Sequence, residues 1–307
     1  MSSRSTGFEV ANVHVPVLLD ETMELLAVRA SGRYLDGTCG LGGHSLAILE
    51  RSAPDGRLLA VDRDARSLAQ AAERLAPFGD RVSMVHADFR DVARGLDAET
   101  FDGALVDLGI SSAQLDDPSR GFSFRAEGPL DMRMDQDRPG VAAELVNRLP
   151  ERALADLIYQ LGEERASRRI ARFIVASRRR KPFETTTELA EVVRRAVGHR
   201  GVGRRGGRGL DPATRTFQAL RISVNRELEG LGESLRILAR HLAPHGRLVA
   251  ISFHSLEDRE VKNTFRELGA SGFRVLTRKP VRPNETQIAA NPRCRSARLR
   301  ALEREAA

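Results

Sequence analysis

The stretch Asp36-Gly-Thr-Cys-Gly-Leu-Gly-Gly-His44 decides the fold class of this 307-residue chain. It follows a short apolar run at residues 33–36 and leads into a helical pattern that begins near Ser45. Glycines at positions 37, 40, 42 and 43 let the backbone turn sharply and lie close to a ligand, where a side chain would clash. Such turns also serve as plain strand-to-helix connections, so the neighbouring elements must show whether a ligand binds there.

Around this turn, apolar runs alternate with helical patterns, which predicts an α/β fold with a parallel sheet and crossover helices. The predicted strands of the first half are residues 33–36, 57–62, 82–86 and 101–107, with a helix at 67–75. Beyond residue 211 the pattern resumes. It predicts a helix at 220–242, a strand at 246–253, a helix at 256–268 and short strands at 273–277 and 297–302.

The segment between these two parts is poor in strand patterns. It predicts helices at 151–161 and 166–180, and a capping box of Thr185 and Glu188 opens another helix. We therefore expect an inserted helical domain at residues 119–213, between two parts of the α/β domain at 1–118 and 214–307. A glycine- and arginine-rich run at 198–209 is expected to be a loop, either a solvated connector or a segment that orders on RNA.

Acidic side chains at the ends of the next predicted strands indicate a nucleoside ligand. Asp62 ends the second strand, where a carboxylate can accept hydrogen bonds from both ribose hydroxyls, with Asp64 as a weaker candidate. Asp88 and Phe89 follow the third strand and could meet an adenine ring by hydrogen bond or stacking. A dinucleotide fingerprint would need glycine where Ser45 stands, so the pattern favours S-adenosylmethionine over a nicotinamide cofactor.

The charge of the chain is unevenly distributed. The net charge is +7, and residues 119–213 hold 20 basic against 13 acidic residues, an excess that equals the whole net charge. Residues 266–307 hold ten basic and four acidic groups. Two basic regions beside a neutral-to-acidic remainder are expected of a small-molecule domain with added nucleic-acid surfaces. The alternative is that arginines simply occupy solvated faces.

Other classes of protein are disfavoured by composition. No apolar run is long enough for a membrane span, and the N-terminal residues lack a signal-peptide core, so we expect a cytoplasmic protein that does not bind membranes. The two cysteines, Cys39 and Cys294, lack disulfide-framework or metal-ligand spacing, and we expect free thiols and no metal.

Long sequence blocks resemble one family. These blocks are HVPVLLDE at 14–21, DGTCGLGGHS at 36–45, DLGISSAQLD at 107–116, RGFSF at 121–125, PLDMRMD at 129–135, GEERASRRIARFI at 162–174, DPATRTFQALRISVNREL at 211–228, ISFHSLEDREVK at 251–262 and NPRCRSARLR at 291–300. Together they resemble the RsmH family, also called MraW, of ribosomal RNA cytidine N4-methyltransferases. Cys39 stands where an aromatic residue is common, and the segment between Leu268 and Asn291 is short.

The resemblance implies a class I S-adenosylmethionine-dependent methyltransferase (Rossmann-like) fold with an inserted helical domain. It further implies methylation of a cytidine amine in the decoding region of small-subunit (16S) ribosomal RNA, as free RNA or in the assembled 30S subunit, and it leaves a homodimer open. By motif, the implied cofactor contacts are Gly42, Gly43, His44, Asp62, Phe89, Asp107 and Gln114.

Candidate catalytic groups follow the fourth predicted strand. Methylation of a cytosine amine needs an acceptor for the emerging proton, because the nitrogen lone pair is delocalised into the ring. Asp107, Ser111 and Ser112 offer acceptors there, and we favour Asp107, which could instead hold the cofactor or cap a turn. His254 ends the fifth major strand and should face the same pocket; phosphate clamping by His254, or capping by Ser255 with Asp258, is expected.

Candidate RNA contacts are aromatic or basic. Phe122 and Phe124 could stack on a base removed from its helix, or pack in the core of the inserted domain. Arg178, Arg179 and Arg180 form a basic run. Arg298 and Arg300 alternate with apolar residues on a predicted edge strand and are expected to contact phosphates.

Two further function classes remain open from the sequence. One is an amino-methyltransferase acting on DNA or on a protein side chain, which would need the same cofactor site. The other is a non-catalytic RNA-binding protein on the same scaffold, which would have lost the glycines or Asp107; both are present.

Overall fold

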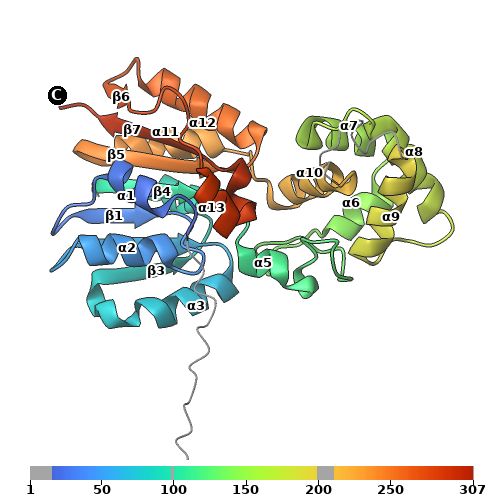
Figure 1. The fold of residues 1–307 in the computed structure, drawn as a ribbon, viewed down its shortest axis with the longest axis horizontal. Helices are drawn as coiled ribbons and strands as arrows, with labels where there is room; N and C mark the ends of the chain where they lie inside the picture. The colour runs from blue at the N-terminus through green and yellow to red at the C-terminus, as the bar shows by residue number, and fades with distance from the viewer. Residues whose placement is uncertain (1–15, 98–99, 199–210, 307) are drawn as a thin grey trace, which may run out of the picture.

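The computed structural model describes residues 16–97, 100–198 and 211–306. Its centre is a seven-stranded sheet in the order β3-β2-β1-β4-β5-β7-β6 (Figure 1). The strands are β1 (Arg33–Asp36), β2 (Arg57–Asp62), β3 (Val82–His86), β4 (Phe101–Asp107), β5 (Leu242–Ser252), β6 (Phe273–Val275) and β7 (Arg298–Arg304). Strands β1 to β5 run parallel, whereas β7 is antiparallel to both β5 and β6. The first four strands have the predicted bounds.

Thirteen α-helices accompany the sheet in the described part of the chain. They are α1 (Leu19–Leu26), α2 (Gly43–Arg51), α3 (Ala65–Leu75), α4 (Phe89–Arg94), α5 (Ser112–Asp116), α6 (Ala142–Arg148), α7 (Glu151–Gly162), α8 (Ser167–Arg178), α9 (Thr186–Val197), α10 (Ala213–Asn225), α11 (Leu231–Arg240), α12 (Ser255–Leu268) and α13 (Glu285–Ala290). None of these helices is long and apolar enough to cross a membrane.

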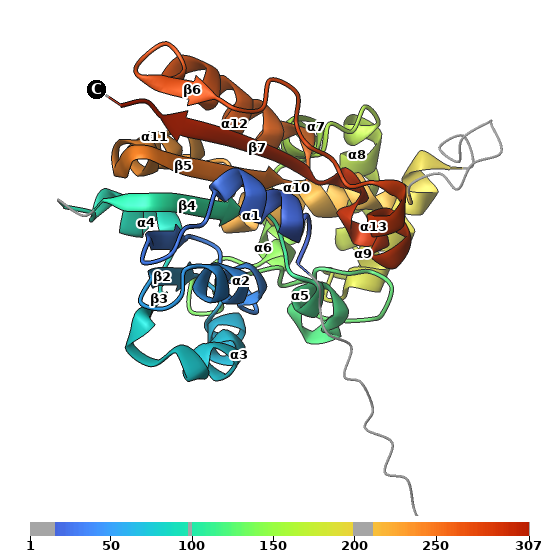
Figure 2. The ribbon, with the colours of Figure 1, turned by 60° about the vertical axis from the view of Figure 1, so that its left-hand side comes forward.

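The central strands are buried on both faces, as expected of a parallel sheet covered by helices. On β4, Leu105 packs in a cluster with side chains of α1, α2 and α3. Its neighbours Ala104 and Val106 pack on the opposite face with α4, α11 and α12. This three-layer arrangement, with one antiparallel strand inserted near the sheet edge (Figure 2), is the predicted class I methyltransferase fold.

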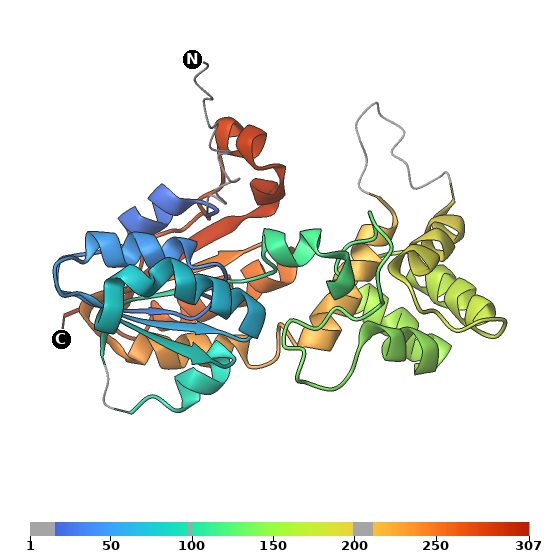
Figure 3. The same ribbon diagram turned by 90° about the horizontal axis from the view of Figure 1, so that it is seen from below.

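A second hydrophobic core lies in the helical lobe, which we define as α6 to α10 with the segment 120–135. Helices α6 to α10 stand apart from the sheet in Figure 3. Their buried residues, among them Ile158, Ile174 and Val193, form a separate cluster. The predicted capping box of Thr185 and Glu188 begins α9. Phe217 and Leu220 of α10 also belong to this core, although the predicted boundary at residue 213 places them in the α/β domain. The domain boundaries stay a prediction.

Two predictions about elements are wrong. The helix predicted at 220–242 is two helices, because Arg226 and Gly230 adopt left-handed backbone angles, φ 49° and 68°, that end α10 and precede α11. The strand carrying Arg298 and Arg300 is not at an edge, since β7 lies between β5 and β6. The glycine- and arginine-rich run predicted at 198–209 lies, after Gly198, outside the described residues.

Candidate active site

A cavity of about 1170 Å³ opens at the carboxyl ends of the parallel strands and extends to the helical lobe. Side chains of both parts line it, including Asp62, Asp107 and His254 from the α/β domain and Phe124 and Arg221 from the lobe. Clefts at this edge are the usual ligand sites of open α/β sheets. The volume exceeds the ~300–1,000 Å³ typical of small-ligand pockets, which leaves room for a cofactor and a base together.

The glycine-rich turn forms one wall of the cavity. Gly40 has a left-handed φ of 54°, and its N–H donates to Asp62 Oδ2 at 2.6 Å, so the turn is tied to the end of β2. Gly43 and His44 line the cavity, as the cofactor prediction requires. Gly42 does not line it: its φ is 76°, and a Cβ there would lie 3.2 Å from Ala71 Cβ, so Gly42 shapes the turn against α3.

Asp62, the predicted ribose acceptor, lies on the same wall. Each of its oxygens accepts one backbone N–H, Gly40 at 2.6 Å and Asp64 at 2.8 Å. Burial raises the pKa of the Asp62 carboxyl. Asp64 is committed to structure: it caps α3 and accepts from Gln114 Nε2 at 2.6 Å and from Arg120 Nη1 at 2.8 Å. The residues fit a nucleoside cofactor at Asp62, not at Asp64.

The two candidates after β3 have different surroundings. Asp88 caps α4 and its carboxylate accepts from Arg90 Nε at 2.8 Å. Phe89 lines the cavity and packs against the turn, because a Cβ at Gly37 would lie 3.0 Å from Phe89 Cβ. Phe89 is therefore the better placed of the two for an adenine ring.

Asp107 ends β4 at the floor of the cavity. Its backbone N–H donates to Thr38 Oγ1, and its Oδ2 lies 3.7 Å from His44 Nδ1. Its Oδ1 is buried and has no hydrogen-bond partner among the described residues. Burial, with added repulsion from Asp36 and Glu257, raises the pKa of Asp107 well above its usual range. An orphaned buried oxygen of this kind is costly and is common where a ligand or proton is expected.

Ser111, Ser112 and Gln114 follow at the start of α5. The Ser111 hydroxyl accepts from Gln114 N at 3.2 Å, and Gln114 Oε1 accepts from Ser111 N at 2.9 Å, which forms a capping box. Gln114 Nε2 donates to Asp64, so this predicted cofactor contact is engaged within the protein. All three residues line the cavity, and Ser112 lies one residue beyond the cap.

His254 lies in the same cavity as Asp107, as predicted. It caps α12 itself, paired with Glu257, where capping by Ser255 with Asp258 was expected. Its Nε2 lies 3.2 Å from Glu257 Oε1 and 3.8 Å from Glu227 Oε2. Burial favours the neutral ring, but Glu227 and Glu257 raise the pKa of His254 to about 9.

Sequence reasoning gave no role to Glu227, Glu257 or Arg221, although all three lie in the resembling blocks. Arg221 donates to both oxygens of Glu227, at 2.9 and 2.8 Å. The ligand atoms of Glu227, His254 and Glu257 lie within 4.8 Å of one another, a grouping that metal sites also use. Arg221 and His254 lie against the two glutamates and offset their negative charge. The absence of a metal stays a prediction.

Some of the candidate RNA residues are buried or hydrogen-bonded within the protein. Phe122 is buried in the lobe core, and Phe124 packs edge-to-face on Phe217 at 4.7 Å; both also line the cavity. Arg178 donates to the carbonyls of Val146 and Leu149, which end α6, at 2.6 and 2.7 Å. Arg179 and Arg180 are exposed.

The predicted phosphate contacts on β7 need correction. Arg300 is buried and donates to Asp258 Oδ1 at 2.8 Å, and Arg298 lies 3.3 Å from the same carboxylate. Because β7 is an interior strand, α12 covers the side chains that an edge strand would have exposed.

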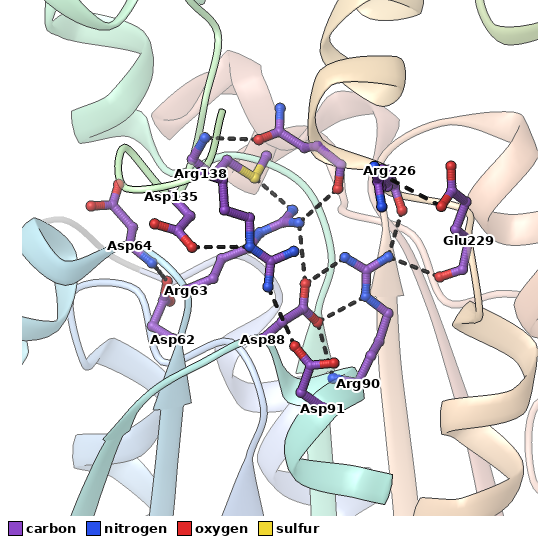
Figure 4. A network of polar contacts seen from close by, with 12 residues as sticks. Asp62, Arg63, Asp64, Asp88, Arg90, Asp91, Asp135, Arg138, Arg226 and Glu229 are labelled. Carbon is purple, nitrogen blue, oxygen red and sulfur yellow. Dashed lines mark hydrogen bonds and ion pairs between the residues drawn. The ribbon is translucent and has the colours of Figure 1, made fainter. Parts of the chain in front are cut away.

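A polar network joins the α/β domain to the helical lobe (Figure 4). Arg63 Nη1 donates to the carbonyl of Asn225, the last residue of α10, at 3.1 Å, and Arg90 Nη1 donates at 2.9 Å to the carbonyl of Glu229, in the connection from α10 to α11. Both guanidiniums also face Asp88. The residue next to Asp62 thus helps to hold the lobe over the cavity. Nothing in the sequence pattern pairs residues so far apart in the chain.

Comparison with known proteins identifies the chain's relatives. The ribosomal RNA small subunit methyltransferases H of Syntrophobacter fumaroxidans and Symbiobacterium thermophilum are 50% and 49% identical to it, each match covering 96% of the relative and 95% and 94% of this chain. That of Sorangium cellulosum is 51% identical, over 95% of this chain and 90% of the relative. The sequence model of the MraW methylase family matches residues 11–305. These matches confirm the resemblance and, with it, S-adenosylmethionine as the methyl donor: the chain belongs to the MraW methylase family.

Proposed function

We propose that this chain methylates the exocyclic N4 amine of a cytidine in the decoding region of 16S ribosomal RNA. The observation that carries the proposal is the Asp107 carboxylate, one oxygen of which has no hydrogen bond to any described residue, in a cavity shared with the glycine-rich turn and Asp62. The printed names of the relatives support a small-subunit ribosomal RNA as the substrate. Free RNA and the assembled 30S subunit are both candidate forms of it.

Bound S-adenosylmethionine supplies an electrophilic methyl group. We assign its binding to Gly43, His44, Asp62 and Phe89, with Gly42 shaping the turn and Gln114 supporting Asp64. Asp62 accepts from the ribose hydroxyls beside the backbone amides that already orient it. Phe89 provides an apolar face for the adenine.

Asp107 is the acceptor for the amine proton. The Thr38 hydroxyl fixes its backbone, His44 lies beside Oδ2, and the partly exposed carboxylate lines the cavity that would receive the substrate amine. Its raised pKa makes the ionised carboxylate a stronger base than an ordinary aspartate. As nitrogen becomes tetrahedral during attack, the N4 proton passes to the Asp107 carboxylate.

The remaining cavity residues position the base. Phe124, and the edge of Phe122, offer an apolar wall on the lobe side for a cytosine taken out of its helix. His254, whose Nε2 faces Glu227 and Glu257, lies in the same cavity and is the candidate for contact with the cytosine carbonyl or a flanking phosphate. Ser112 is the secondary acceptor.

The test uses purified protein, labelled S-adenosylmethionine, and 16S RNA and 30S particles from a strain lacking the native enzyme. We expect N4-methylcytidine at one position, identified by nucleoside mass spectrometry after nuclease mapping. A methyl group on a ring carbon, on ribose or on another base would overturn the proposal. A comparison of the two substrates shows which form is used.

A further inference from the structure

The outer face of α8 is composed of arginines. Of the twelve residues of Ser167–Arg178, the exposed ones are Arg168, Arg169, Arg172 and Ala176. The buried residues, such as Ile170 and Ile174, lie on the other side, in the lobe core. Arg179 and Arg180 continue the exposed set past the end of the helix. At 1.5 Å rise per residue, the arginines from 168 to 179 span about 16 Å.

These arginines lack acidic partners. No ion pair is formed by the side chains of Arg168, Arg172, Arg179 or Arg180 with any part of the chain that the structure describes, and Arg169 lies over the Phe173 ring at 5.7 Å. Other exposed arginines of the lobe do have partners: Arg148 lies 3.9 Å from Glu144, and Arg152 lies 4.0 Å from Asp156. Arg125, Arg165 just before α8, and Arg195 of α9 are also exposed without an ion pair in the described part of the chain, but only on α8 do several such arginines share one helix face.

The arrangement is unfavourable for the isolated protein. The sequence of α8 contains no aspartate or glutamate, and Arg168 and Arg169 occupy its first turn. The N-terminal end of a helix carries partial positive charge, so cations there are disfavoured and anions are favoured. Closely spaced guanidiniums repel one another as well. A polyanion on this face would relieve both penalties.

We propose that the arginine face of α8 binds the phosphate backbone of the ribosomal RNA substrate, away from the methylated base. The proposal rests on the proposed function. Helix α8 lies at the end of the lobe far from the sheet (Figure 1), so the contact reaches a part of the RNA that does not enter the cavity. The lobe then acts as a clamp that adds affinity without touching the reacting atoms.

The test compares Arg168→Gln/Arg172→Gln with the control Arg148→Gln/Arg152→Gln. Both variants remove two exposed charges from the lobe, but only the control residues have acidic neighbours. Binding to a naked 16S RNA fragment that contains the decoding region is measured over a range of salt concentrations. Each lost phosphate contact lowers the log-log salt slope by about 0.7–0.9, so we expect a decrease of about 1.4–1.8 for the α8 variant and little change for the control.

Methylation assays separate this proposal from the proposed function. The α8 variant should show a raised KM for RNA with kcat and S-adenosylmethionine affinity unchanged. An unchanged salt slope, or equal losses in both variants, would overturn the α8 assignment even if the parent methylates cytidine. A parent that binds RNA through α8 but yields no N4-methylcytidine would overturn the proposed function alone. If the α8 variant lost binding only to 30S particles and still bound naked RNA, the partner of α8 would be a protein, and the α8 assignment would be overturned.

Discussion

Asp88 and Asp107 follow two strands of the same sheet, yet their surroundings differ completely. Asp88 lies between Arg90 and Arg63, which overcome the effect of burial and lower its pKa to about 2. Asp107 has His44 at 3.7 Å and one oxygen without a hydrogen-bond partner among the described residues, and burial raises its pKa. Arginine partners satisfy the first carboxylate, whereas Oδ1 of the second has no hydrogen bond within the described residues. The end of β3 thus helps to hold the lobe in place, whereas the end of β4 is where we propose the chemistry.

The largest effect is expected at Asp88. Asp88→Asn leaves the guanidiniums of Arg63 and Arg90 without their counter-charge, and breaking such a buried pair costs about 3–5 kcal/mol of unfolding free energy. Urea unfolding of the parent and the variant at pH 7 measures this difference in unfolding free energy. The lowered pKa also predicts a pH effect: the stabilisation is present above the ordinary pKa of 3.8 and is lost as pH falls toward 2, so the parent should lose more stability there than the variant, in which only other carboxyls such as Glu227 still titrate. Equal stability of both proteins at pH 7 would contradict the role of the network.

Asp107→Asn should leave stability nearly unchanged but lower single-turnover methylation by about 10²-fold or more, because the proton acceptor is removed. The rate is measured at saturating S-adenosylmethionine, with cofactor and RNA affinities determined separately. In the parent, the rate should rise with pH as Asp107 ionises, at a pH above the usual carboxylate range. Near-parent rates in the variant would shift the acceptor role to Ser111, Ser112 or His254.

Asp62 is intermediate between Asp88 and Asp107. Its oxygens accept hydrogen bonds, but from backbone amides rather than from arginines. Asp62→Ala should weaken S-adenosylmethionine binding by about 1–3 kcal/mol in a folded protein, measured by calorimetry. Asp62→Asn, which keeps one acceptor oxygen, should lose less. If affinity is unchanged in the alanine variant, the ribose is held elsewhere.

The arginines at the end of α8 also differ in whether the fold already engages their side chains. Arg178 satisfies two carbonyls of α6, so Arg178→Gln should cost about 1–2 kcal/mol of stability with little change in RNA binding. Arg179→Gln/Arg180→Gln should alter stability by less than about 0.5 kcal/mol and reduce only the salt dependence of RNA binding. Thermal unfolding and salt titrations distinguish the two patterns, and a reversed result would mean that Arg178 is the RNA contact.

Local patterns predicted the sheet well, because strands buried on both faces leave continuous apolar runs with acidic residues at their ends. Local patterns failed where contacts between distant residues decide the structure. The break at Arg226 is marked by no proline, and the position of β7 inside the sheet depends on β6, a strand of only three residues. Asp62 and Asp107 were found because each ends a predicted strand. Glu227, Glu257 and the partners of Asp88 were missed because their meaning comes from residues distant in the chain.

The polar network at the seam between α10 and the α/β domain limits how the lobe of this enzyme can be exchanged for that of another. The carbonyls of Asn225 and Glu229 receive their hydrogen bonds from Arg63 and Arg90, which the α/β domain supplies. A helical lobe grafted onto another methyltransferase scaffold would keep its own core but lose these donors, unless the host offered two arginines and a counterpart of Asp88. The lobe is therefore not a portable module, and an exchange of specificity between enzymes must transfer both sides of the seam.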